Sequence, residues 1–231
     1  MSKILFVLTG ADRLTLADGS QHPTGFWAEE AVVPYRALKA AGHEVVVATP
    51  GGALPPVDRA SLAAEVNGGQ ERADEIARGL EEMTELRKPV KLAEVDLDDF
   101  AAVFYPGGHG PMEDLAVDED SGRLLVTALD SGRPLAVVCH GPAALLAAVR
   151  ADGANAFAGR PVAAFTNEEE TQGGLAPRVR WLLEDRLTEA GVDVRTAAPW
   201  APHVVVDGNL ITGQNPASSA PVAQELLKRL G

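Results

Sequence analysis

The sequence of 231 residues contains a single cysteine, Cys139. It therefore cannot form a disulfide within the chain or a zinc site built from several cysteines. A lone thiol is typical of a reducing compartment, so we expect a cytoplasmic protein. No apolar stretch approaches the roughly 18 residues of a membrane span, and the short apolar run after Lys3 is no secretory leader. We therefore expect no membrane partner.

Basic residues are also scarce, with 20 Lys and Arg against 33 Asp and Glu and a net charge of −13. An acidic surface repels phosphate backbones, so we expect no nucleic-acid partner. The loop that follows the first apolar run, Thr9-Gly10-Ala11-Asp12-Arg13, lacks the dinucleotide fingerprint, and the chain has no phosphate-binding P-loop motif. No histidine pair shows metal-site spacing. We therefore expect neither a cofactor nor a metal.

Short, valine-rich apolar runs alternate with helical patterns along the chain, and this alternation predicts the fold. The runs lack polar alternation, which is typical of parallel strands covered on both faces. The predicted strands are Ile4–Leu8, Glu44–Thr49, Ala101–Tyr105, Leu135–Val138 and Val162–Phe165. The predicted helices are Phe26–Ala41, Ser121–Ser131, Gly141–Arg150, Val179–Ala190 and Ala217–Leu230. We expect one α/β domain over residues 1–231, with a doubly wound, mainly parallel, flavodoxin-like sheet flanked by helices.

Two segments depart from this alternation. Residues 50–91 begin with Pro50-Gly51-Gly52 and continue into a charged helical pattern over Glu71–Lys88, so we expect a small cap inserted into the domain. Near the C-terminus, Val204–Val206 and Leu210–Thr212 flank a turn signal, which predicts a β-hairpin.

Cys139 occupies the position where chemistry is expected. It ends the buried run Pro134–Val138 and precedes His140-Gly141, so it stands between a strand and the start of a helix. A nucleophile at such a turn is directed out of the sheet, and helix-start N–H groups lower a thiol pKa. We therefore expect an accessible, low-pKa thiol. The alternative is a small buried cysteine that fills space at a strand end.

A glycine-rich loop, Tyr105-Pro106-Gly107-Gly108-His109-Gly110, follows the third predicted strand. Glycines allow the backbone to approach a ligand closely, and their N–H groups can face a developing oxyanion. Gly107, Gly108 and His109 are therefore candidate substrate-binding residues, although a plain turn has the same composition.

Five motifs in this order resemble the ThiJ/PfpI superfamily, which has the class I glutamine amidotransferase-like fold. The similarity is strongest to its glyoxalase III-like branch, which also includes heat-inducible holding chaperones. The motifs are Thr24-Gly25-Phe26-Trp27-Ala28-Glu29-Glu30 with Pro34, Tyr105-Pro106-Gly107-Gly108-His109-Gly110, Val138-Cys139-His140-Gly141-Pro142, Phe165-Thr166-Asn167-Glu168-Glu169-Glu170 and Thr212-Gly213-Gln214-Asn215-Pro216-Ala217-Ser218. Together they span nearly the whole chain.

The resemblance implies that Cys139 is the nucleophile and His140 its partner. Glu170 falls at the third position of the triad, with Glu169 as the alternative, and Glu30 matches an acid beside the cysteine. A carboxylate next to a thiolate resists ionisation, so Cys139 and Glu30 should share one proton. Glu29, the neighbour of Glu30, is the alternative on that helix. The resemblance also implies a homodimer.

The implied activity is the cofactor-independent conversion of a small 2-oxoaldehyde, methylglyoxal or glyoxal, into a 2-hydroxy acid through a cysteine hemithioacetal. Deglycase activity is a related expectation. The alternatives are a holding chaperone and a thiol redox or stress-response protein, and a lesser one is an isonitrile hydratase or peptidase-like hydrolase. Amidotransferase activity is disfavoured, because the late His203-Val204-Val205 lacks the required His-x-Glu pair.

Overall fold

A central seven-stranded sheet organises the molecule, which the computed structural model describes over residues 1–231. In spatial order its strands are β10 (Val204–Asp207), β11 (Leu210–Gly213), β7 (Leu135–Val138), β6 (Ala102–Tyr105), β1 (Lys3–Val7), β4 (Glu44–Thr49) and β5 (Val90–Lys91). All neighbouring pairs are parallel except β10 with β11. The carboxyl ends of the parallel strands therefore meet at one edge of the sheet, where the site lies.

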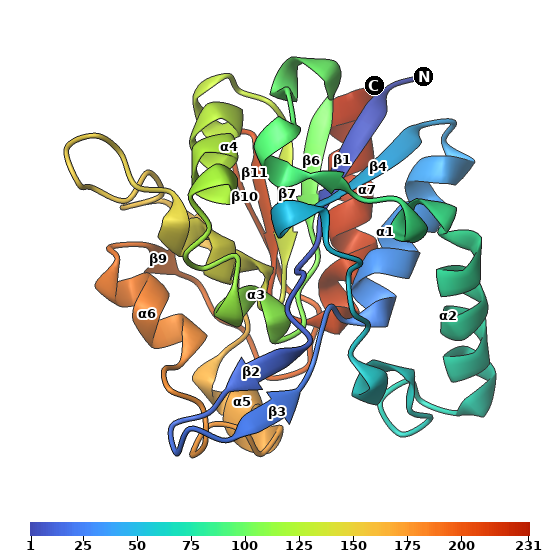
Figure 1. The fold of residues 1–231 in the computed structure, drawn as a ribbon, viewed down its shortest axis with the longest axis vertical. Helices are drawn as coiled ribbons and strands as arrows, with labels where there is room; N and C mark the ends of the chain where they lie inside the picture. Colours follow the sequence, from blue (N-terminus) through green and yellow to red (C-terminus); the bar gives the residue numbers. More distant parts are fainter.

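Helices flank this sheet, and the predicted fold class is confirmed (Figure 1). Helices α1 (Ala28–Ala40) and α7 (Ser219–Leu230) pack against each other and against the sheet, while α4 (Glu119–Asp130) packs against β7. The shorter helices are α3 (Gly110–Glu113), α5 (Asn167–Gln172) and α6 (Leu183–Glu189). None of the helices combines the length and apolar character that a bilayer crossing requires.

Residues 50–91, expected to form a cap, lie beside α1 and at one edge of the sheet. Helix α2 (Gln70–Glu82) packs against α1, and Figure 1 shows it on the outer side of that helix. Strand β5 pairs with the end of β4 and extends the sheet by one short strand. Gly79 permits the close packing, since a Cβ there would collide with the Val32 side chain of α1.

Three predicted elements differ from the structure. The strand predicted over Val162–Phe165 is reduced to β8 (Pro161–Val162), which pairs with β9 (Asp193–Val194) outside the central sheet. Beyond β8 the chain bonds to the site, because the Phe165 N–H donates to the Cys139 carbonyl oxygen at 3.0 Å. The helix predicted over Gly141–Arg150 is a 3-10 segment, Gly141–Ala147.

The third difference is the late start of α6, which was predicted from Val179 but begins at Leu183. Val179 instead forms an isolated antiparallel bridge with Leu16. That bridge joins the segment to a hairpin absent from the sequence prediction, formed by β2 (Arg13–Thr15) and β3 (Gln21–Pro23). Both strands of the hairpin are short and mainly polar, so their composition did not stand out as strand.

Candidate active site

Cys139 follows β7 with a backbone conformation that is rare for its residue type. Its φ of 61° lies in the left-handed region, and Trp200 is the other non-glycine residue with positive φ. Two backbone hydrogen bonds hold the turn: the Cys139 N–H donates to Gly213 O at 2.8 Å, and the Cys139 carbonyl accepts from Phe165 N–H at 3.0 Å. Strain held in this way is typical of a functional turn.

Cys139, His140 and Glu170 form a connected chain of polar contacts. The Cys139 Sγ lies 3.3 Å from His140 Nδ1, and His140 Nε2 lies 2.8 Å from Glu170 Oε2. All three residues are buried. The structure therefore brings together a thiol, an imidazole and a carboxylate in the order that nucleophilic catalysis uses.

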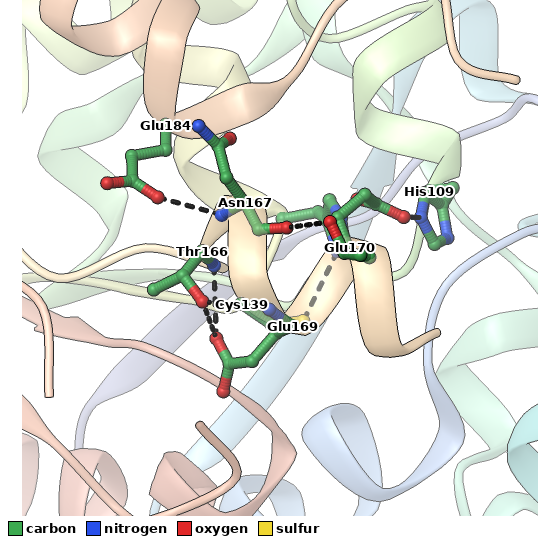
Figure 2. A network of polar contacts seen from close by, with 9 residues as sticks. His109, Cys139, Thr166, Asn167, Glu169, Glu170 and Glu184 are labelled. Atoms are coloured by element: carbon green, nitrogen blue, oxygen red, sulfur yellow. Dashed lines mark hydrogen bonds and ion pairs between the residues drawn. The ribbon is translucent and has the colours of Figure 1, made fainter. Parts of the chain in front are cut away.

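Glu170 has a second imidazole partner. Its Oε1 lies 2.9 Å from His109 Nε2, so each carboxylate oxygen contacts one histidine (Figure 2). The two imidazole rings are 4.1 Å apart between centroids. Burial lowers the pKa of His140, and the neighbouring His109 lowers it further, against the opposing effect of Glu170. His140 is therefore a neutral base near neutral pH, with its acceptor nitrogen available to the thiol.

Glu169, the alternative to Glu170, has a different role. Figure 2 shows the two side chains pointing away from each other, with Glu169 directed toward Thr166. Glu169 Oε2 accepts from the N–H and the hydroxyl of Thr166, which completes a capping box at the start of α5. Its Oε1 accepts from the Trp200 N–H and from the Asn215 side-chain amide. The carboxylate thus joins three segments, and Glu170 alone of the pair contacts His140.

Glu30 reaches Cys139 from α1. Its Oε2 accepts from the Gly107 N–H at 2.6 Å, while Oε1 is buried without a hydrogen-bond partner. Complete burial raises the pKa of Glu30 to about 8, despite lowering contributions from Cys139 and the Gly107 N–H. Glu30 is therefore protonated near neutral pH. Glu29, by contrast, forms an ion pair with Arg72 at 3.1 Å.

The glycine loop closes over the same site. A Cβ at Gly107 would lie 2.6 Å from His140 N and 2.8 Å from Glu30 Oε2, so only glycine allows these three elements to approach. Gly108 has a φ of 86°, and its N–H acts to lower the pKa of the Cys139 thiol. This N–H is placed to stabilise negative charge on the sulfur or on a bound oxyanion.

The prediction of an accessible, low-pKa thiol is wrong. Cys139 is only 3% exposed, and burial, followed by the nearby Glu30 carboxyl, raises the pKa of its thiol well above the usual range. The Cys139 N–H is already bonded to Gly213, and the hydrogen bond from Gly108 does not outweigh these effects. Near neutral pH the thiol and Glu30 therefore each keep a proton instead of sharing one.

The sequence analysis missed two aromatic residues beside the triad. The Phe165 and His140 rings are tilted by 32° with their centroids 4.3 Å apart, and Trp200 meets Phe165 edge-on at 5.6 Å. The Trp200 indole N–H donates to Gln172 Oε1 at 2.6 Å. Phe165 lies within a motif that the sequence analysis singled out, but nothing in the sequence pointed to Trp200.

The same cluster contains a set of atoms that could ligate a metal. One ring nitrogen each of His109 and His140 and a carboxylate oxygen of Glu170 all lie within 4.8 Å of one another. A larger surface cavity of about 670 Å³ is lined by Leu14, Met112 and Trp181, and none of the site residues lines it.

Known proteins resemble the chain over most of its length. A curated relative is the protein/nucleic acid deglycase HchA of Staphylococcus aureus (strain MSSA476), 30% identical, with the match covering 94% of this chain and 76% of the relative. The solved structure of Francisella tularensis Rapid Encystment Protein 24 KDa is 27% identical, with a TM-score of 0.87 and 100% coverage of both chains. Glyoxalase III from Candida albicans is 24% identical with a TM-score of 0.79, covers 99% of this chain and 97% of its own, and shows the fold.

The family model described as the DJ-1/PfpI family matches residues 23–229. This range includes all five motifs on which the resemblance rests, and the resemblance is thereby confirmed. The chain belongs to the DJ-1/PfpI family.

Proposed function

We propose that the chain is a cysteine-dependent enzyme that converts small 2-oxoaldehydes, methylglyoxal or glyoxal, into 2-hydroxy acids without a cofactor. The observation that carries this proposal is the placement of the Cys139 thiol between a neutral imidazole, His140, and a protonated carboxyl, Glu30. A thiol with a base on one side and an acid on the other suits addition to a carbonyl, which needs both.

In the first step, His140 Nδ1 accepts the thiol proton while the sulfur attacks the aldehyde carbon. The 3.3 Å separation between Sγ and Nδ1 is short enough for this transfer. The carbonyl oxygen takes a proton from Glu30, and the Gly108 N–H stabilises the charge that develops before that transfer. The product is a hemithioacetal, and Glu30 is left as a carboxylate.

In the second step, the Glu30 carboxylate removes the hydrogen from the former aldehyde carbon, which the neighbouring ketone has made acidic. Glu30 returns this proton to the adjacent carbon, and the protonated His140 gives its proton to the former ketone oxygen. The hydroxyl proton of the first carbon passes to Glu30, which gives the thioester of the 2-hydroxy acid and restores neutral His140. One carbon is oxidised and its neighbour reduced, so the electrons balance within the substrate. Water then hydrolyses the thioester, with His140 as the base, and the thiol is regenerated.

Release of the same aldehydes from glycated amines is the related activity that we propose for this site. The name of the Staphylococcus aureus relative, a protein/nucleic acid deglycase, supports it at 30% identity. An amine adduct of a 2-oxoaldehyde carries the same two adjacent oxygen-bearing carbons. The thiol would thus replace the amine at the same carbon, and the amine would leave with a proton from Glu30.

The test is methylglyoxal turnover by chelator-treated protein in the absence of NAD and glutathione, with detection of lactate. We expect turnover by the wild-type protein and by the control Glu29→Gln, and none by Cys139→Ala or Cys139→Ser. Turnover retained by Cys139→Ala, or seen only after NAD, glutathione or a metal is added, would contradict the proposal. If the wild-type protein instead only prevents aggregation of unfolded proteins, and Cys139→Ser does so equally, the holding-chaperone alternative is favoured.

A further inference from the structure

Two histidines and one glutamate converge on the side of the site that faces away from the sulfur. His109 and His140 each direct Nε2 at a separate oxygen of Glu170, at 2.9 and 2.8 Å. We propose that His109, His140 and Glu170 form a binding site for Zn²⁺ that inhibits the enzyme. The residues come from three separate segments of the chain, which explains why sequence spacing predicted no metal site.

The donor set fits zinc. Two neutral imidazole nitrogens with one carboxylate oxygen, and water at the fourth position, are a ligand set that zinc uses in proteins. Bonds of about 2.0–2.1 Å in a tetrahedral arrangement place neighbouring ligand atoms roughly 3.3 Å apart. The separation of His140 Nε2 from Glu170 Oε2 is 2.8 Å and that of His109 Nε2 from Glu170 Oε1 is 2.9 Å, so each carboxylate oxygen has one nitrogen within about half an ångström of this value. The three atoms already lie within 4.8 Å of one another, so a small shift of His109 completes the site.

The burial of these side chains and the support of Glu170 by α5 also suit a metal site. The side chains of His140 and Glu170 are 2% and 3% exposed, which keeps them from competing water. The His109 side chain is 13% exposed, so the cluster is open to solvent on the side where a zinc ion would enter and keep a water ligand. Glu170 is held by α5, whose first turn is fixed by the capping box of Thr166 and Glu169. Two of the three ligands are thus preorganised, which favours binding.

The position of the sulfur explains why zinc would inhibit. Cys139 Sγ contacts His140 at Nδ1, on the opposite side of the ring from the proposed zinc. A neutral imidazole that binds zinc through Nε2 must carry its proton on Nδ1. That nitrogen can then no longer accept the thiol proton. Zinc would therefore block the step for which His140 is the base, without being bonded to the sulfur. This inhibitory effect rests on the proposed function, whereas zinc binding does not.

The experiment measures zinc affinity of the full-length, chelator-treated protein by competition with a chromogenic zinc chelator. We expect one equivalent of Zn²⁺ to bind, and no binding of Mg²⁺, which prefers oxygen ligands. His109→Gln and Glu170→Gln should each weaken zinc binding at least about tenfold, whereas Cys139→Ser should bind with unchanged affinity. His43→Gln is the matched control, because His43 lies between α1 and β4, at the opposite edge of the sheet.

A further variant separates ligation from misfolding. His109→Asp supplies a carboxylate oxygen at the same position and should recover part of the affinity that His109→Gln loses. Absence of zinc binding by the wild-type protein, unchanged affinity in His109→Gln, or loss of binding in Cys139→Ser would each overturn the proposal. In wild-type protein that turns over methylglyoxal, zinc should abolish turnover and a chelator should restore it. Binding without any turnover would leave the zinc site intact and contradict the proposed function alone.

Discussion

Two carboxyl groups on either side of Cys139 are both buried, yet near neutral pH one keeps its proton and the other is ionised. Glu30 on α1 is 0% exposed and has a pKa raised to about 8, while Glu170 on α5 is 3% exposed and has a lowered pKa. Burial acts to raise the pKa of both groups. The groups that contact a buried acid, and not the extent of its burial, therefore decide whether it keeps its proton.

The groups that contact Glu30 and those that contact Glu170 differ in number and kind. Glu30 accepts one backbone hydrogen bond, from Gly107, and leaves one oxygen without a partner. Glu170 contacts an imidazole at each oxygen, and its interactions with His140 and His109 outweigh the effect of burial. Environments that separate the pKa values of two carboxyl groups divide the roles of proton donor and fixed anion between them. Four predictions test this division.

The largest expected effect is that of Glu30→Gln. The amide keeps the size of the side chain but cannot donate and then accept a proton. Loss of a general acid–base group lowers turnover about 10²- to 10⁴-fold, so we expect a fall of that size in methylglyoxal turnover. Glu29→Gln, which removes one of the two carboxylate partners of Arg72, should leave turnover near the wild-type value. Turnover by Glu30→Gln within a few-fold of wild type would remove Glu30 from the mechanism.

Glu170→Gln should have a smaller effect. The amide oxygen still accepts a hydrogen bond from His140 Nε2, but the negative charge that supports the imidazole is lost. Removal of the partner that orients a metal-ligating imidazole costs about 10- to 100-fold, and we expect a fall of similar size in turnover here. Glu168→Gln, on the exposed side of α5, is the control. A larger loss for Glu170→Gln than for Glu30→Gln would reverse the assigned roles.

Glu169→Gln tests whether Glu169 stabilises the fold without taking part in the reaction. Its carboxylate accepts hydrogen bonds from Thr166, Trp200 and Asn215, so its loss should destabilise the fold by more than the loss of Glu170 does. We expect a lower midpoint of thermal unfolding for Glu169→Gln than for Glu170→Gln. Turnover per folded molecule should change less in Glu169→Gln than in Glu170→Gln. The opposite order in both measurements would mean that Glu169 and Glu170 are exchanged in solution.

The smallest effect concerns stability as a function of pH. The pKa of Glu30 rises from its usual value of 4.5 to about 8 on folding, so the folded state binds this proton more tightly than the unfolded state does. Its contribution to stability is therefore complete below pH 4.5 and is lost as pH rises through about 8. The free energy of unfolding in urea should fall less over this range in Glu30→Gln than in wild type. Equal slopes would show that Glu30 ionises normally.

The sequence was sufficient for the fold and for part of the site. The buried parallel strands could be predicted because their apolar runs are continuous, and Cys139 and His140 could be paired because they are adjacent. The pattern Thr166-x-x-Glu169 is a capping-box signature and was a local reason to assign Glu169 to the helix start. The capping box separates Glu169 from Glu170, which their position in the motif alone does not.

Other features depend on contacts between distant segments. The pKa of the Cys139 thiol was predicted in the wrong direction because the sequence does not show that the thiol is buried beside Glu30. The contact between His109 and Glu170 joins residues 61 positions apart, so no local sequence pattern predicts it. Likewise, Phe165 leaves the predicted strand because its N–H bonds to Cys139.

The most direct measurement is the infrared spectrum of the carboxyl groups near pH 7, which separates protonated from ionised acids. We expect a band from a buried protonated carboxyl in the wild-type protein, its loss in Glu30→Gln, and its retention in Glu170→Gln. A band that persists in Glu30→Gln and disappears in Glu170→Gln would contradict the account, because the proton would then lie on the wrong side of Cys139.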